Sequence, residues 1–483
     1  MKKNFFYSLL LSLVNILFPI LSFPYASRIL GPVGIGKVQF VISFAQYFAL
    51  FAALGIPIYG IKEAAKYKDD QKKLSAVFTE LTIIFFIASL LLFTVYLVVL
   101  FSFPFFTTNR PLYLYAGILI LLSFSYTDWF YAGIEEFRAI TLRSVIIKII
   151  SLVLLYAFIR TGADFRKYLF IIIFSILGNQ ILSFLMVFKK TSFDFSDLDF
   201  RKHVQPLLYI FSATLAASIY TVLDTVLLGF LSTEKAVGLY TASVKLIKIT
   251  IPIITSMGVI LIPAISKNFA RNNMQEIKQL LDKSFTYLVF LSVPIGFGLA
   301  ILAPEFIIIF SGNQFIKAAT SMQVLSLLPI LVGFGHFFCL QILMPAGKNK
   351  EIFFSMLAGV FTCLALNFIL VPSMHEIGES IANVCTELIV TLCYFYFIRK
   401  HYTLAYNWKF VLQSVISALI FFPVVSLMRY AHLNAIFTLL MSIFACASVY
   451  AAIQLFIFKN TFLFNFIKPI KNKFWLYKSL DNE

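Results

Sequence analysis

The sequence predicts an all-α integral membrane protein with fourteen transmembrane helices, organised as two six-helix lobes and two further helices at the C-terminal end. The first observation behind this fold class is composition: 60% of the 483 residues are hydrophobic and 13% are charged, whereas a soluble domain is about half apolar and a quarter charged. The second is that apolar runs of about 20 residues recur, long enough to cross a hydrocarbon core of roughly 30 Å. The third is an internal repeat.

In the first half of the chain, short polar or glycine-containing segments separate six apolar runs. The first run follows Lys2 and Lys3, but it is longer than the apolar core of a signal peptide, so we interpret it as a retained helix. The breaks between the runs read GPVG, the lysine-rich KEAAKYKDDQKK, PFFTTNR, EEFR and TGADF. The six expected helices span residues 5–30, 35–60, 75–100, 111–133, 140–160 and 166–188.

The second half shows the same alternation and then adds two runs. The expected helices span residues 207–230, 237–262, 282–303, 317–343, 351–371, 378–398, 409–428 and 435–458. The longest connections are expected at residues 189–206 and 263–281, and neither is long enough to hold a folded domain. A basic tail follows the last helix.

The internal repeat relates the two halves in the same orientation. Val33-Gly34-Ile35-Gly36 aligns with Val237-Gly238-Leu239-Tyr240, and this offset superimposes the second helix on the eighth. Transporters place their substrates between such repeats. The expected domains are therefore an N-terminal lobe (1–200), a C-terminal lobe (201–400), helices 13 and 14 (401–460) and a cytoplasmic tail (461–483).

Basic residues give the orientation. If the N-terminus is cytoplasmic, the cytoplasmic segments carry about three times as many Lys and Arg residues as the outer ones. Both termini are then expected in the cytoplasm of a bacterial cell with the chain in the inner membrane. The net charge of +17 follows mostly from this asymmetry, so it indicates anionic lipid headgroups as neighbours and not nucleic acid.

A few charged side chains fall inside the expected helices. Lys148, Lys245 and Lys248 do so, and a charge about 12 Å deep costs about 2.5 kcal/mol or more unless it faces a polar cavity or a partner. Lys245 and Lys248 share one helix face, where like charges repel unless an anion lies opposite. Acids are also present within helices, among them Asp128, Asp224 and Glu387. Each is a candidate for an ion pair or for a proton carrier, and the sequence leaves both open.

Other chemistry is not indicated. The five cysteines lie in apolar runs without a CxxC spacing, and the five histidines are scattered. The sequence therefore predicts no metal site and no enzyme. It predicts no cofactor other than a coupling ion, H⁺ or Na⁺.

Three stretches carry a resemblance to a known family. They are SRILGPVGIGKVQF at residues 27–40, DWFYAGIEEFR at 128–138 and LDTVLLGFLSTEKAVGLYTASVKLIKI at 223–249. Their order and spacing resemble the polysaccharide transporters of the MOP superfamily, the Wzx-type flippases. The resemblance implies a MATE-like, V-shaped pair of lobes around a central cavity. It also implies transport of undecaprenyl-diphosphate oligosaccharides to the outer leaflet for O-antigen, lipopolysaccharide, capsule or exopolysaccharide synthesis.

Such a substrate is strongly anionic, so cations are expected to line the cavity. Arginine can grip a phosphate in a bidentate manner, and Arg28 is similar to the arginine at the same place in the related lipid II flippases. An interfacial arginine above a plain turn is the alternative. The candidate binding residues are Arg28, Lys37, Lys148, Lys245 and Lys248. The candidate hinge residues are Gly31, Pro32, Gly34 and Gly36.

Two other functions remain as alternatives. A MATE-type multidrug or cation antiporter needs acids for its cationic drugs, but residues 5–30 contain neither Asp nor Glu. A membrane polymerase or ligase of the same pathway needs a sizeable outer loop, but the outer connections are short. The expected partners are the lipid-linked oligosaccharide, membrane lipids, and the polymerase and chain-length proteins of the pathway.

Overall fold

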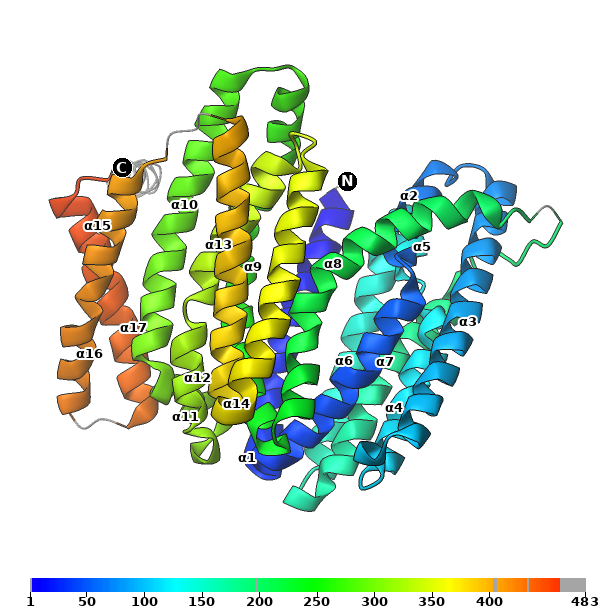
Figure 1. Ribbon diagram of the computed structural model, residues 1–483, viewed down its shortest axis with the longest axis horizontal. Helices are drawn as coiled ribbons and strands as arrows, with labels where there is room; N and C mark the ends of the chain where they lie inside the picture. Colours follow the sequence, from blue (N-terminus) through cyan, green and yellow to red (C-terminus); the bar gives the residue numbers. More distant parts are fainter. Residues whose placement is uncertain (1, 197, 403–405, 432–433, 461–483) are drawn as a thin grey trace, which may run out of the picture. The chain divides into compact units, whose positions relative to one another are not determined.

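The computed structural model describes residues 2–196, 198–402, 406–431 and 434–460. Within these ranges all regular elements are helices (Figure 1). The chain forms two compact units. Unit 1 comprises Met1–Thr241, Phe310–Phe315 and Ala365–Glu379, and unit 2 comprises Ala242–Ile309, Ile316–Leu364 and Ser380–Glu483. The predicted lobe boundaries stay a prediction, and the predicted tail at 461–483 lies outside the described residues.

The helices follow one another with short connections. Those up to residue 231 are α1 (Lys2–Ala53), α2 (Ile56–Lys66), α3 (Gln71–Ser102), η1 (Pro104–Phe106), α4 (Arg110–Leu121), η2 (Ser123–Ser125), α5 (Asp128–Gly133), α6 (Phe137–Phe158), η3 (Gly162–Asp164), α7 (Phe165–Val187) and α8 (Arg201–Leu231). Those that follow are α9 (Glu234–Ala270), α10 (Met274–Ile301), α11 (Ala303–Ser311), η4 (Asn313–Phe315), α12 (Ala318–Leu325), α13 (Leu328–Phe338), η5 (Cys339–Leu343), α14 (Asn349–His401), α15 (Trp408–Leu419), α16 (Phe421–Tyr430), α17 (Ala435–Ala452) and η6 (Ile453–Ile457).

Many of these helices are long and apolar enough to span a membrane. The described residues contain ten such helices, or eleven if α4 and the η2–α5 segment, bent by 41°, count as one span. Moreover, α1 and α14 have 52 and 53 residues, and each contains one residue with non-helical backbone angles, Gly31 and His375. The all-α membrane fold predicted from the sequence is confirmed, whereas the number of fourteen crossings stays a prediction.

The first break lies inside the GPVG segment. Gly31 has φ +66°, a left-handed conformation that glycine adopts without the steric penalty that a Cβ brings. Pro32 follows directly, at the start of the next helical stretch, where its missing N–H is not needed. The expected helices 5–30 and 35–60 thus form the two arms of α1, and the dark-blue ribbon changes direction between them (Figure 1).

Several expected boundaries are wrong. The helix expected to reach residue 60 stops at Ala53, because Leu54 and Gly55 both have positive φ, and Pro57 lies in the first turn of the separate helix α2. The connection expected at 263–281 is mostly helical. Within it, α9 continues to Ala270, and α10 begins after Asn273, whose side chain accepts the Glu276 N–H at 3.3 Å.

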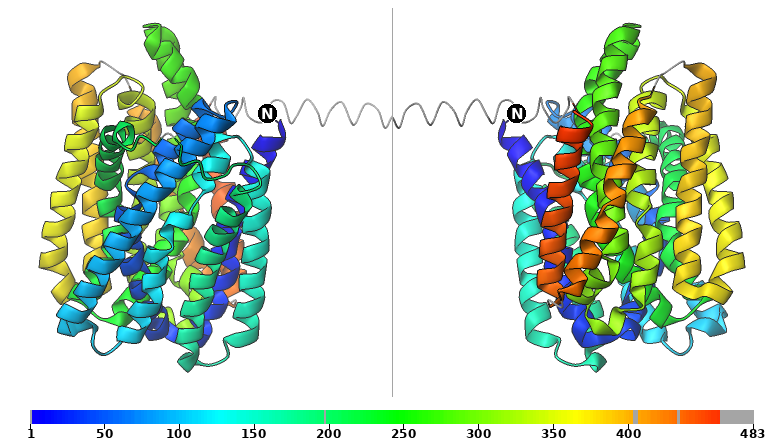
Figure 2. Two further views of the ribbon diagram at one scale, coloured as in Figure 1. Left: turned by 90° about the vertical axis from the view of Figure 1, so that its right-hand side faces the viewer. Right: turned by 90° about the vertical axis from the view of Figure 1, so that its left-hand side faces the viewer.

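Each unit has its own apolar core. In unit 1 the core is built around Phe78, Leu81 and the aromatic run Trp129–Tyr131. In unit 2 it is built around Phe285, Phe337 and Tyr450, among others. Figure 2 shows the helices of each unit running side by side. Large apolar side chains also remain outside the cores. Leu9, Leu13, Leu17 and Leu21, spaced by four along α1, are each about half exposed, which suits a face covered by lipid.

Candidate functional site

The two repeated motifs touch each other backbone to backbone in unit 1. A Cβ placed on Gly36 would lie 1.7 Å from the carbonyl oxygen of Glu234, and one on Gly238 would lie 1.9 Å from that of Pro32. Because only a hydrogen fits there, these glycines allow α1 and the start of α9 to cross at contact distance. Of the four predicted hinge residues, Gly31 has the non-helical angles. Gly36 instead has a packing role, and its role as a hinge stays a prediction.

Lys37 lies beside this crossing and forms an ion pair and a cation–π contact there. Its Nζ is 3.4 Å from a carboxylate oxygen of Glu234 and 5.3 Å from the centre of the Phe165 ring. Asn109 also donates to Glu234, at 3.1 Å. The surroundings of Lys37 therefore hold an acid that already compensates its charge.

Arg28 lies one turn before the break in α1. Its side chain is exposed, and its aliphatic part packs against Gly312, where an added Cβ would be 3.1 Å from Arg28 Cγ. Gly312 has φ +93°, so a glycine is favoured there by backbone conformation as well as by space. The packed stem and exposed guanidinium suit the role of an anion-binding side chain.

Asp128 forms an ion pair, which is one of the two roles that the sequence left open for it. Its carboxylate accepts from Arg143 Nη2 and, at 3.1 Å, from Ser183 Oγ. Arg143 Nε in turn donates to Asn179 at 2.7 Å. The predicted binding residue Lys148 donates to Asn15 on α1. These contacts join α5, α6, α7 and α1 within unit 1.

In unit 2 the structure brings three predicted residues together. Lys245 and Lys248 on α9 influence each other electrostatically, and Glu387 on α14 interacts with Lys248 in the same way. Lys248 is exposed, and Lys245 and Glu387 are partly exposed. The lysine–glutamate group (Lys245, Lys248 and Glu387) thus combines two ammonium groups with one carboxylate inside membrane-spanning helices.

Asp224 belongs to a second group of buried acids, which lies in unit 1 and also contains Glu379. The sequence analysis singles out Asp224 but not Glu379. Tyr240 Oη donates to its carboxylate at 2.9 Å. Glu379, which is fully buried, is influenced by the charge of Asp224 and lies near Asn367. Neither carboxylate oxygen of Glu379 has a hydrogen bond of ordinary geometry within the described residues. Two carboxylates that interact in this way repel each other unless a cation binds between them or one of them is protonated.

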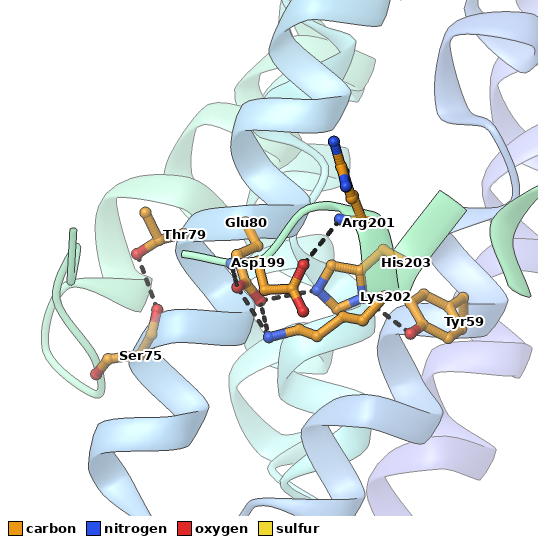
Figure 3. Close-up of polar contacts among 8 residues, drawn as sticks. All are labelled: Tyr59, Ser75, Thr79, Glu80, Asp199, Arg201, Lys202 and His203. Carbon is orange, nitrogen blue, oxygen red and sulfur yellow. Dashed lines mark hydrogen bonds and ion pairs between the residues drawn. The ribbon is translucent and has the colours of Figure 1, made fainter. Parts of the chain in front are cut away.

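A polar network at the start of α8 was missed from the sequence (Figure 3). Glu80, fully buried on α3, accepts from Lys202 at 2.8 Å, from the Asp199 N–H at 2.7 Å and from His203 Nε2 at 2.8 Å. The other ring nitrogen of His203 lies 2.8 Å from Tyr59 Oη. Burial raises the pKa of Tyr59 to about 12, so its hydroxyl stays protonated. The network holds Asp199 and the first turn of α8 against α2 and α3.

Comparisons with known proteins agree with this architecture. Residues 1–269 match the family described as polysaccharide biosynthesis protein. The putative O-antigen transporter of Escherichia coli (strain K12) is 24% identical over 411 residues, which cover 83% of this chain and 97% of that protein.

Two solved structures share the fold at 15% identity. The Lipid II flippase MurJ in an inward closed conformation has a TM-score of 0.73 and covers 95% of this chain and 100% of its own. An inward-facing multidrug resistance MATE family transporter of the MOP superfamily has a TM-score of 0.63, with 80% and 93% covered. The fold is therefore MATE-like. Because the family match extends over more than half of the sequence, the chain belongs to the polysaccharide biosynthesis protein family.

Proposed function

We propose that this protein is a flippase that moves undecaprenyl-diphosphate-linked oligosaccharides from the cytoplasmic to the outer leaflet by alternating access. The family, the similarity to an O-antigen transporter and the MATE-like fold support this function. The observation that carries it within the molecule is the lysine–glutamate group, in which two cations and one acid lie inside membrane-spanning helices.

The physical reason is charge compensation. A diphosphate that leaves water for a low-dielectric site loses its hydration, and fixed cations are needed to offset that loss. Lys245 and Lys248 supply them in unit 2, and Arg28, with its exposed guanidinium, supplies one in unit 1. Arginine adds the bidentate geometry that a phosphate accepts.

Energy for directed transport is proposed to come from a coupling ion. Asp224 and Glu379 are the candidates because two interacting buried carboxylates have a strong affinity for H⁺ or Na⁺. Replacing Glu379 by Gln removes one charge and keeps the volume. The variant is expected to lose the dependence of transport on the ion gradient, while Glu376→Gln, three residues earlier on α14, keeps it. Unchanged ion dependence in Glu379→Gln would exclude this acid.

A MATE-type antiporter is the second candidate, since that fold is shared. Recognition of cationic drugs favours acids at the binding site, whereas residues 5–30 contain neither Asp nor Glu, and Arg28 is exposed in that arm of α1. A membrane polymerase or ligase has less support, because two relatives that each match over more than four fifths of this chain are named putative O-antigen transporters. The protein is a multi-pass membrane protein. We propose the bacterial inner membrane with cytoplasmic termini, and the polymerase and chain-length proteins as partners.

The double variant Lys245→Gln, Lys248→Gln tests the proposal in cells that lack their own flippase. It removes both charges but keeps side-chain length and hydrogen bonding, so surface glycan is expected to fall at least tenfold at an unchanged amount of protein in the membrane. Lys235→Gln is the matched control, because Lys235 is exposed in the first turn of the same helix. Normal surface glycan in the double variant would remove the lysine pair from the transport site.

A further inference from the structure

A cavity in unit 1 is not used by the proposed transport site. It has a volume of about 380 Å³ and lies between α6 and the last turns of α7. Aliphatic side chains from both helices form its walls, and two arginines lie among them. The residues that matter here are Arg138, Leu142, Arg143, Ile146, Leu182 and Met186.

The residues of α6 that line the cavity include a row along one face of the helix. Arg138, Leu142 and Ile146 follow one another at steps of four residues, so they lie in one row. The row begins with an exposed guanidinium and continues with two aliphatic side chains that are 42% and 54% exposed. Over about 12 Å the surface therefore changes from cationic to apolar. Such a surface is complementary to an amphiphile with an anionic head.

The charged groups that line the cavity differ in how far other side chains compensate them. Glu136 is already bound by Lys190 at 2.5 Å. Arg143 is 4% exposed and paired with Asp128 through Nη2, but its Nη1 has no hydrogen-bond partner in the described parts of the chain. In addition, α6 has 22 residues and begins here, and Glu136 makes no capping hydrogen bond within the described chain. The first peptide N–H groups and the helix dipole add positive potential at that point.

We propose that this cavity binds an anionic phospholipid of the leaflet that faces the start of α6. The phosphate is held by Arg138 and the first turn of α6, and one acyl chain lies along Leu142, Ile146 and Leu182. Basic pockets between membrane helices on the cytoplasmic side bind such lipids. A glycan-bearing substrate is disfavoured, because the described side chains that line the cavity include no hydroxyl or amide group to hold a sugar. The proposal does not depend on which molecule is transported.

The test uses the full-length protein, delipidated in detergent and titrated with cardiolipin, phosphatidylglycerol or phosphatidylcholine, with binding followed by native mass spectrometry. Arg138→Gln is expected to weaken binding of both anionic lipids about tenfold. Arg166→Gln, which alters an exposed arginine at the opposite end of α7, is expected to leave it unchanged. A second variant, Ala139→Phe, fills the cavity and is expected to weaken binding while leaving the melting temperature without lipid unchanged.

Two outcomes would overturn the proposal. Equal binding of phosphatidylcholine and cardiolipin at the Arg138-dependent site would show that the anionic head is not recognised. Displacement of cardiolipin by an equimolar amount of undecaprenyl diphosphate would assign the cavity to the transported lipid instead. Transport by Arg138→Gln is measured separately in cells. Failure of the lipid site and failure of the proposed function therefore give different results.

Discussion

The glycine crossing between α1 and α9 allows a quantitative prediction. In Gly36→Ala the new methyl carbon would lie 1.7 Å from the Glu234 carbonyl oxygen, whereas an ordinary contact begins at 3.4 Å. The atoms that the methyl carbon would meet belong to the backbone, and a methyl group has no other rotamer, so the two helix segments must move apart. Overpacking of this kind costs about 1–3 kcal/mol, and the backbone contact favours the upper end of that range.

The matched control is Gly298→Ala. Gly298 lies in α10, where a Cβ would meet no atom within 4 Å, so alanine is expected to stabilise the helix by up to about 1 kcal/mol. The same propensity gain applies at Gly36 and partly offsets the clash there. The free energies of unfolding of the two variants are therefore expected to differ by roughly 3 kcal/mol.

The assay is thermal unfolding of the full chain in detergent, with both variants heated at the same rate because membrane proteins often unfold irreversibly. Gly36→Ala is expected to melt several degrees below the wild type and Gly298→Ala at or above it. If Gly36→Ala melts together with Gly298→Ala, then α1 and α9 do not cross at contact distance and the packing described here is wrong.

Three further predictions concern the network, the topology and the arginine. Glu80→Gln removes the charge of a fully buried carboxylate and is expected to destabilise the protein by about 2–3 kcal/mol in the same melting assay. The exposed control Glu276→Gln is expected to change the stability little, and equal melting of the two variants would contradict the network. In a cysteine-free background, a cysteine at Lys68 should resist impermeant maleimide in intact cells and one at Thr108 should react; the reverse labelling would invert the orientation. Arg28→Ala should cut surface glycan strongly and Arg28→Lys should restore part of it; full activity of the alanine variant would exclude Arg28.

The sequence predicted features that depend on local pattern. The all-α membrane fold followed from composition and run length. The two lysines on one face of α9 pointed to Lys245 and Lys248, and the structure places Glu387 near Lys248. The repeated VG motifs were also recognised. Their mutual contact was not, because a spacing of 204 residues says nothing about which backbones meet.

The features that were missed depend on contacts between distant residues. Glu80 and His203 are 123 positions apart, and nothing near Glu80 in the sequence indicates that the start of α8 contacts it. Glu379 lies next to the start of the expected helix 378–398, and the sequence does not indicate that it is buried. The sequence does not indicate the helical course of 263–270, because Pro263 favours a boundary there, whereas membrane helices tolerate proline when the freed backbone groups find other partners.

Flipping can be measured with the purified protein in liposomes that contain a lipid-linked oligosaccharide in both leaflets. Exposure of the oligosaccharide at the outer leaflet is followed over time by an impermeant enzyme that cleaves it. With the wild-type protein, rapid exposure of the whole pool is expected. With the variant Lys245→Gln, Lys248→Gln, exposure of only the outer half is expected. The flippase would be contradicted if half of the pool stayed protected with the wild-type protein. If the same preparation also exchanged a cationic drug for H⁺ or Na⁺, the result would favour the antiporter.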